Sequence, residues 1–266
     1  MRVLSLVDKT AVIVRRDMLT AVRYRIGFLL SAAGAITELA AFYYLARAVG
    51  PGFRPEGFEY FSFLLIGTGF YTFLLMSVHA FLETVREAQQ TGTLEVLMTT
   101  STSPPVLVFL STMSAFAANT VTLAFYLIAG LVFGAPLRPN VVSSLAVFVL
   151  SVVVAAAIGL LAAALQLAVQ KGAAVVWVLG SVWFLTGTLF PVATLPRPLR
   201  HLADVIPITH SLVGMRLALL EGASLSGVGR ELLILAAFAL ALVPGSLLVF
   251  SWTLRRARLA GTLSFY

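Results

Sequence analysis

The sequence predicts an all-α membrane protein with six transmembrane helices, and three observations support this fold class. Apolar residues make up 60% of the chain and charged residues only 11%, whereas a soluble domain is nearer half apolar and a quarter charged. The mean hydropathy of +1.00 indicates the same class. A chain of 266 residues has room for about six apolar segments with short loops, but not for a large soluble domain as well. We therefore expect a single transmembrane domain covering residues 1–266.

Six apolar runs are long enough to cross about 30 Å of hydrocarbon. They lie at 26–49, 60–82, 106–133, 141–169, 173–190 and 232–254. The third and fourth runs are rich in small residues, as in 155–159, which lets membrane helices approach closely. The chain has no cysteine, so disulfides and cysteine-bound metals are excluded.

The segment 1–25, before the first span, is expected to form an amphipathic helix. Apolar residues recur in it at three- and four-residue spacing from Leu4 to Val22, and basic residues recur every seven residues from Arg2 to Arg23. Such a helix can lie in the membrane interface with its basic face toward anionic headgroups. The alternative is a soluble helix packed on a partner, but the span that follows at once favours the interface.

The distribution of Lys and Arg predicts the orientation in the membrane. Eleven of the 18 basic residues fall on the side that receives both termini and the stretch 83–105, and seven fall on the other side. Because cytoplasmic segments carry the excess of positive charge, both termini are expected in the cytoplasm. The net charge of +7 does not indicate nucleic-acid binding, because no basic and aromatic face is evident.

Two segments interrupt the pattern of spans. Residues 83–105 form a stretch of helical character on the cytoplasmic side, polar first and amphipathic afterwards. On the far side, four prolines cut 191–230 into short, partly apolar pieces at 199–205 and 208–220. Broken helices at membrane depth persist only where they pack against protein or line a cavity. We therefore expect exofacial re-entrant half-helices at the outer mouth of a pathway.

Few residues are candidates for chemistry. The G-x-x-x-x-G-K-[ST] phosphate loop is missing, so this chain is not expected to hydrolyse ATP, and no catalytic, cofactor or metal site is predicted. His201 and Asp204 have helical spacing, but two ligands make a weak metal site, and hydrogen bonding is the better interpretation. Glu38 is a carboxylate deep in a predicted span. It either faces a pathway or a partner chain, or is protonated and hydrogen-bonded within the bundle.

Two motifs, in order along the chain, resemble those of type 2 ABC exporter permeases, the membrane-spanning subunits of drug, polysaccharide and polyol exporters. Glu87, the run 91–97 (Thr-Gly-Thr-Leu-Glu-Val-Leu) and the Ser-Pro step at 103–104 resemble the cytoplasmic signature of that family. The proline-rich segment 190–222 resembles its exofacial segment. One departure is the Gln-Gln pair at 89–90, where family members often carry Arg or Glu.

The resemblance implies a mechanism. Two permease chains, identical or related, would form the pathway in a bacterial-type cytoplasmic membrane. Two separate ATPase subunits, which bind ATP and Mg, would dock on the coupling segment within 83–105 and drive export. The coupling residues expected from this resemblance are Arg86, Glu87, Gly92, Thr93, Leu94 and Glu95. Glycine at position 92 supplies conformational freedom for a break between two helices.

A secondary transporter or channel driven by an ion gradient is the alternative function. Such proteins place ionisable groups at the membrane midplane and often contain inverted repeats, whereas here only Glu38 qualifies and no repeat is visible. A membrane-embedded enzyme would need clustered His, Asp or Glu near the interface. A neighbouring reading frame with a phosphate loop, or a copurifying ATPase, would favour the ATP-driven exporter.

Overall fold

The computed structural model describes residues 25–93, 104–169, 178 and 180–259, and no strand occurs among them. The α-helices are α2 (Arg25–Val49), α3 (Tyr60–Gln90), α5 (Pro104–Val132), α6 (Val141–Val169), α8 (Arg197–Asp204), α9 (Pro207–Arg216) and α10 (Gly229–Leu259). Shorter turns are the 3₁₀ helices η1 (Pro55–Gly57), η2 (Val182–Phe184) and η3 (Val192–Thr194) and the π-helical turn η4 (Leu217–Glu221).

Four of the described helices, α3, α5, α6 and α10, are long and apolar enough to cross a membrane, and a fifth crossing results if α8, α9 and η4 are counted together. The four coincide with the second, third, fourth and sixth predicted spans. α2 has 25 residues, and at about 1.5 Å per residue it has the length of a crossing. The predicted interfacial helix lies outside the described residues except for Arg25. Of the predicted span at 173–190, the described part from 180 onward is no long helix but the 3₁₀ helix η2 followed by turns, so a regular spanning helix is not found there. Six crossings therefore stay a prediction.

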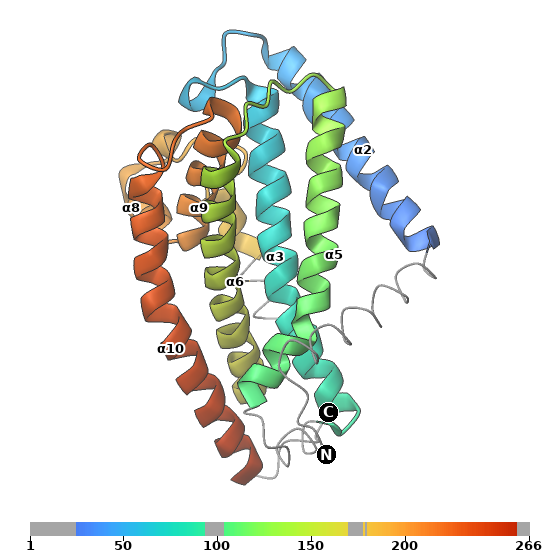
Figure 1. The fold of residues 1–266 in the computed structure, drawn as a ribbon, viewed down its shortest axis with the longest axis vertical. Coiled ribbons are helices and arrows are strands. Elements are labelled where there is room, and N and C mark those ends of the chain that lie inside the picture. The colour runs from blue at the N-terminus through green and yellow to red at the C-terminus, as the bar shows by residue number, and fades with distance from the viewer. Residues whose placement is uncertain (1–24, 94–103, 170–177, 179, 260–266) are drawn as a thin grey trace.

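The long helices give the bundle two ends. At one end, which we call the Gly50 end, α2 leads into α3 and α5 leads into α6; at the other, the Gln90 end, α3 and α6 finish and α5 begins (Figure 1). α3 packs against both α5 and α6, and α10 packs along α6. α2 leans away from the other helices toward its Arg25 end (Figure 1).

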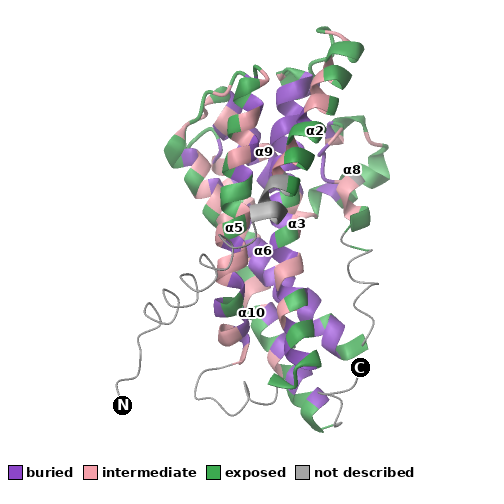
Figure 2. Cartoon of the chain, turned by 90° about the vertical axis from the view of Figure 1, so that its right-hand side faces the viewer, coloured by how far each residue is buried: buried purple, intermediate pink, exposed green. Residues whose placement is uncertain are grey.

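α3 forms the core of the bundle. In its most apolar stretch 83% of the residues are buried, compared with 22% in α5 and 17% in α10 (Figure 2). The rings of Phe63, Phe70 and Phe81 are almost completely buried along its length. Large apolar side chains on α5 and α10 stay exposed, including Val132 and Leu240, as expected for helices that face lipid.

Small residues allow close contacts around α3. A Cβ at Gly159 of α6 would overlap the ring of Phe81, and a Cβ at Gly69 of α3 would overlap the ring of Tyr126 in α5. The hydroxyls of Thr68 and Tyr126 lie 3.1 Å apart at the second of these contacts. The run 155–159, which the sequence predicts to pack closely, is mostly buried in α6.

α8 and α9 form a bent pair that precedes α10. A proline lies in the first turn of each helix, and the axes of α8 and of α9 with η4 differ by 84°. α9 has 10 residues, so it extends about 15 Å, roughly half the thickness of the hydrocarbon layer. These helices coincide with the broken pieces that the sequence predicts at 199–205 and 208–220. Their re-entrant path stays a prediction.

The turn η4 is attached to the connection between α5 and α6. The backbone N–H of Arg138 donates to the carbonyl of Leu219 at 2.8 Å, and that of Asn140 donates to the carbonyl of Ala218 at 2.9 Å. Gly222 ends η4 with φ of +68°, and a Cβ at this position would meet the carbonyl of Arg138. A left-handed glycine is therefore required for both the turn and the close contact.

Candidate functional site

The first half of the predicted coupling segment continues α3. The sequence predicts that the second span ends at Leu82 and that 83–105 has helical character, and the helix runs without interruption to Gln90. It continues because helical spacing is kept beyond the span, with Val85 and Ala88 buried against the bundle. The other side of these last two turns carries exposed polar residues. We call this surface the polar stripe, and it consists of Glu83, Arg86, Glu87 and Gln90.

The polar stripe carries one internal ion pair. Arg86 Nη1 lies 3.5 Å from Glu83 Oε1, and the two side chains are 53% and 71% exposed. An exposed pair of this kind contributes little to stability. Glu87 is also exposed, and none of the ion pairs among the described residues includes it. Its carboxylate is therefore available to a soluble partner.

α3 ends at a turn built around Gly92. The N–H and the hydroxyl of Thr91 both donate to the carbonyl of Glu87, at 2.9 and 2.8 Å. The hydroxyls of Thr91 and Thr93 lie 2.9 Å apart. Gly92 has φ of +68°, a left-handed conformation that favours glycine. The helix thus breaks at Gly92, as the sequence predicts. Leu94 and Glu95 lie outside the described residues, and their predicted coupling role stays a prediction.

Glu38 lies in the middle of α2 and lines a cavity of about 210 Å³ between α2, α3 and α5. The polar residues that line the cavity come from all three helices and are Glu38, Thr72, Asn119, Thr122 and Tyr126. Glu38 is exposed in the isolated chain. The cavity thus places one carboxylate and four other polar side chains among otherwise apolar helices.

Arg216, at the end of α9, is only 1% exposed. Its Nη2 donates to the carbonyl oxygens of Gly187 at 2.8 Å, Thr188 at 3.3 Å and Phe63 at 3.3 Å. Its Cζ lies 3.5 Å from the centroid of the Phe63 ring, and its Nη1 lies 3.8 Å from Glu56 Oε2. We call this group of five residues the Arg216 clamp.

The Arg216 clamp depends on a glycine in α3. A Cβ at Gly67 would overlap Arg216 Nη2 and the carbonyl oxygen of Thr188. The absence of a side chain at this position lets the guanidinium and the chain at Thr188 reach the backbone of α3. The clamp therefore joins α3, α9, the η1 loop and the residues after η2.

His210 connects α9 to its two neighbouring helices. Its Nδ1 lies 2.6 Å from Glu231 Oε2 in the first turn of α10, and its Nε2 lies 2.9 Å from the carbonyl of Asp204 at the end of α8. The carbonyl oxygen of Asp204 can only accept a hydrogen bond, so His210 Nε2 carries a proton and donates it. A second proton lies in the hydrogen bond between His210 Nδ1 and Glu231.

Sequence reasoning missed the Arg216 clamp and the His210–Glu231 pair. An arginine inside the partly apolar piece 208–220 is the only local signal for the clamp. The weak pair considered from the sequence, His201 and Asp204, acquires no further ligand: the described part of the chain holds no group of three or more His, Asp or Glu residues arranged for a metal. Instead, the backbone carbonyl of Asp204 accepts the hydrogen bond from His210.

The long apolar helices, packed around α3, define a multi-pass membrane protein. The sequence model of the family described as ABC-2 family transporter protein matches residues 51–248, well over half of the chain. The chain therefore belongs to the ABC-2 family of transporter proteins, and its resemblance to ABC permeases is confirmed. No curated protein matches the chain. The matched region includes the polar stripe, the Arg216 clamp and the His210–Glu231 pair.

Proposed function

We propose that this chain is the membrane-spanning permease subunit of an ATP-driven exporter. Membership of the ABC-2 family supports a transport role without catalysis in this chain. ATP and Mg would bind in separate ATPase subunits, two per transporter. A second permease chain, identical or related, would complete the pathway in the bacterial-type cytoplasmic membrane.

The polar stripe is the observation that carries this proposal. It is an exposed, charged surface of one helical face, and it lies at the end of the most buried helix of the bundle. A soluble partner that binds Glu87 pushes directly on α3. Because buried helices are packed as tightly as organic crystals, a displacement of α3 is passed to its neighbours rather than absorbed. This is the arrangement that a two-state transporter needs between its motor and its pathway.

The cavity at Glu38 is the proposed contact with the pathway or with the second permease chain. It opens between α2 and the bundle core, where α2 leans away (Figure 1). A carboxylate at this depth is costly unless it faces water, a ligand or a partner. The surroundings of Glu38 would therefore change when α2, α3 or α5 moves.

The Gln90 end is the proposed cytoplasmic side, with both termini on that side. The last turns of α10 carry basic residues at this end, including Arg256 and Arg258. The excess of positive charge supports a cytoplasmic position. Soluble ATPase subunits would reach the polar stripe only from this side.

The experiment that tests this function compares two charge deletions. Glu87→Ala should weaken binding of the ATPase subunit about tenfold or more, because a hydrogen bond to a charged group is worth about 1.5–3 kcal/mol. Glu221→Ala removes an exposed carboxylate at the Gly50 end and should leave binding unchanged. Binding is measured between the purified permease in detergent and the ATPase encoded in a neighbouring reading frame.

Two results would contradict the proposed function. ATP turnover by the purified chain alone would place the motor in this chain rather than in a partner. Transport that needs an ion gradient and proceeds without any ATPase would favour the secondary transporter or channel. If wild type and Glu87→Ala bind the ATPase equally well, the polar stripe is not the coupling surface.

A further inference from the structure

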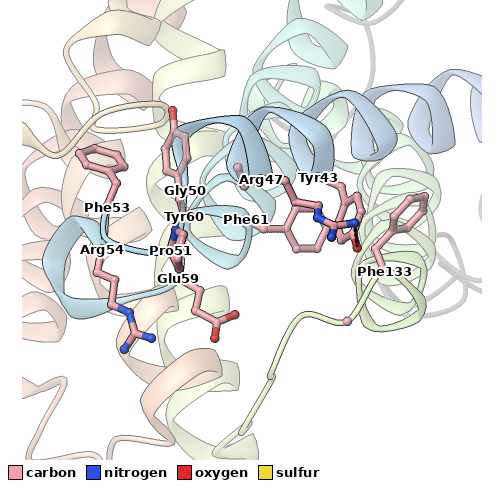
Figure 3. Close-up of a pocket in the computed structure, with 12 residues that line it drawn as sticks. Tyr43, Arg47, Gly50, Pro51, Phe53, Arg54, Glu59, Tyr60, Phe61 and Phe133 are labelled. Carbon is pink, nitrogen blue, oxygen red and sulfur yellow. Dashed lines mark hydrogen bonds between the residues drawn. The ribbon is translucent and has the colours of Figure 1, made fainter.

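A second cavity, of about 370 Å³, lies at the Gly50 end, apart from the cavity at Glu38. Its walls come from the last two turns of α2, the loop that follows, the start of α3 and the residues directly after α5 (Figure 3). Gly50 and Gly134 turn the chain there with φ of +91° and +92°. The volume is in the range of small-molecule sites, enough for one polar group of a larger ligand.

Aromatic rings build the walls of this cavity. Tyr43 packs edge-on against Phe61 with ring centroids 5.7 Å apart, and Phe53 packs edge-on against Tyr60 at 4.9 Å. Tyr60 and Phe61 are only 7% and 8% exposed, so the inner wall is held by the bundle core. Tyrosines at the end of a membrane helix are typical of the depth of lipid headgroups.

Charges of both signs line the same cavity. Arg47 and Arg54 contribute guanidinium groups, and Glu59 contributes a carboxylate; Figure 3 shows Arg54 and Glu59 extending in the same direction. Arg47 lies against Tyr43, with Nη1 3.4 Å from the hydroxyl and Cζ 5.6 Å from the ring centroid. None of the ion pairs formed among the described residues includes Arg47, Arg54 or Glu59. All three charges therefore remain available to a ligand.

We propose that this cavity binds the headgroup of a phospholipid that carries both a phosphate and an amine. Arg54 binds the phosphate, because guanidinium groups form charge-assisted hydrogen bonds to phosphate oxygens. Arg47, which Figure 3 shows beside Tyr43 and apart from Arg54, adds a second positive charge to the cavity wall. Glu59 binds the amine, and the aromatic rings beside it favour a cation at their faces. A purely anionic headgroup would satisfy the arginines but would place a negative charge near Glu59.

The surroundings of the cavity favour a lipid over a soluble phosphate ester. Next to the lining residues, Tyr44 is 67% exposed, Val49 is 47% exposed and Val132 is 83% exposed. These residues adjoin lining residues in the sequence and expose apolar surface on α2 and at the end of α5. Acyl chains covering that surface gain about 25 cal/mol for each Å² removed from water, which a free headgroup does not.

The test measures lipid binding by the purified full-length chain in detergent with native mass spectrometry. Phosphatidylethanolamine and phosphatidylglycerol are titrated separately, and glycerophosphoethanolamine is added as the free headgroup. Wild type should bind phosphatidylethanolamine several-fold more tightly than phosphatidylglycerol. The double variant Arg47→Gln with Arg54→Gln should bind both lipids about tenfold or more weakly. Arg197→Gln, which removes an exposed arginine outside the cavity, is the matched control and should behave as wild type.

Glu59→Gln decides the assignment even if the double variant fails to fold, because it keeps both arginines. It should bind the two lipids equally, and an unchanged preference for phosphatidylethanolamine would overturn the role of Glu59. Equal weakening by Arg197→Gln and by the double variant would overturn the site itself. Release of the lipid by glycerophosphoethanolamine at equal concentration would identify a soluble phosphate ester as the ligand instead.

Discussion

Arg216→Met should destabilise the protein strongly, although Arg216 contacts neither a proposed ligand nor a proposed partner. The change keeps a long side chain but removes the donors that reach Gly187, Thr188 and Phe63. It also leaves Glu56 without the guanidinium 3.8 Å from its carboxylate. Buried carbonyl oxygens that lose a donor cost free energy because water does not replace it.

The expected magnitude follows from the geometry of the Arg216 clamp. Three carbonyls share the two protons of one Nη, which amounts to about two charge-assisted hydrogen bonds of about 1.5–3 kcal/mol each. The contact with Phe63 adds about 2 kcal/mol when desolvated, and the cost of burying the guanidinium opposes all of these terms. The charge left behind on Glu56 is 29% exposed, so the main loss is at the buried carbonyls, each of which costs about 1–3 kcal/mol when it is left without a donor. We therefore expect a net loss of about 3–5 kcal/mol. For a chain of this size that lowers Tm by roughly 6–20 °C.

Thermal unfolding of the purified protein in detergent measures this effect, and Arg197→Met on the exposed start of α8 is the control. Gly67→Ala should also lower Tm, because the added Cβ overlaps Arg216 Nη2 and the carbonyl of Thr188. Since both changes act on one contact, the double variant should lose less than the sum of the single losses. A Tm for Arg216→Met within about 2 °C of wild type, or strict additivity with Gly67→Ala, would refute the clamp.

Two further predictions follow from the other sites. Gly92→Ala should cost about 1–2 kcal/mol through its left-handed φ, although a Cβ there meets no atom within 4 Å, and Gly92→Asn should cost less; equal Tm values for the two variants would argue against backbone strain. Glu38→Gln should change transport or its pH dependence while size-exclusion chromatography shows intact assembly, and unchanged transport across a pH series would favour a hydrogen-bonded structural role.

The apolar runs predicted the position of the long helices because burial in lipid and helical hydrogen bonding act on the same residues. The predicted span ends at Leu82 while the helix continues to Gln90, as the helical character predicted for the start of 83–105 indicates. A hydropathy pattern stops at the first polar residues, whereas backbone hydrogen bonds continue while one face stays buried. Glu83 is exposed but Val85 is fully buried, so the helix persists. The break at Gly92 was predictable because only glycine adopts that conformation at low cost.

The interactions at the Gly50 end could not be predicted from the sequence. Arg216 meets Glu56 and Phe63 across most of the chain, and His210 meets Glu231 across the turn between α9 and α10. Local spacing carries no information on such pairs, because they form only when separate helices pack. Glu38 was predicted to be unusual by its depth alone, but the cavity around it requires three helices.

α3 connects the functional features because its opposite faces meet different parts of the bundle. Gly67 and Gly69 are two positions apart, about 200° around the helix, so a contact at one lies opposite a contact at the other. Gly67 faces Arg216 and Thr188, while Gly69 faces Tyr126 and lines the cavity at Glu38. The polar stripe lies on the last turns of the same helix. A rotation or shift of α3 that a partner imposes at Glu87 must therefore change the contact with Tyr126, the contact with Arg216, or both. A single rigid helix, α3, thus connects the proposed ATPase contact with the cavity at Glu38 and with the Arg216 clamp. No further series of contacting side chains is needed to couple these sites.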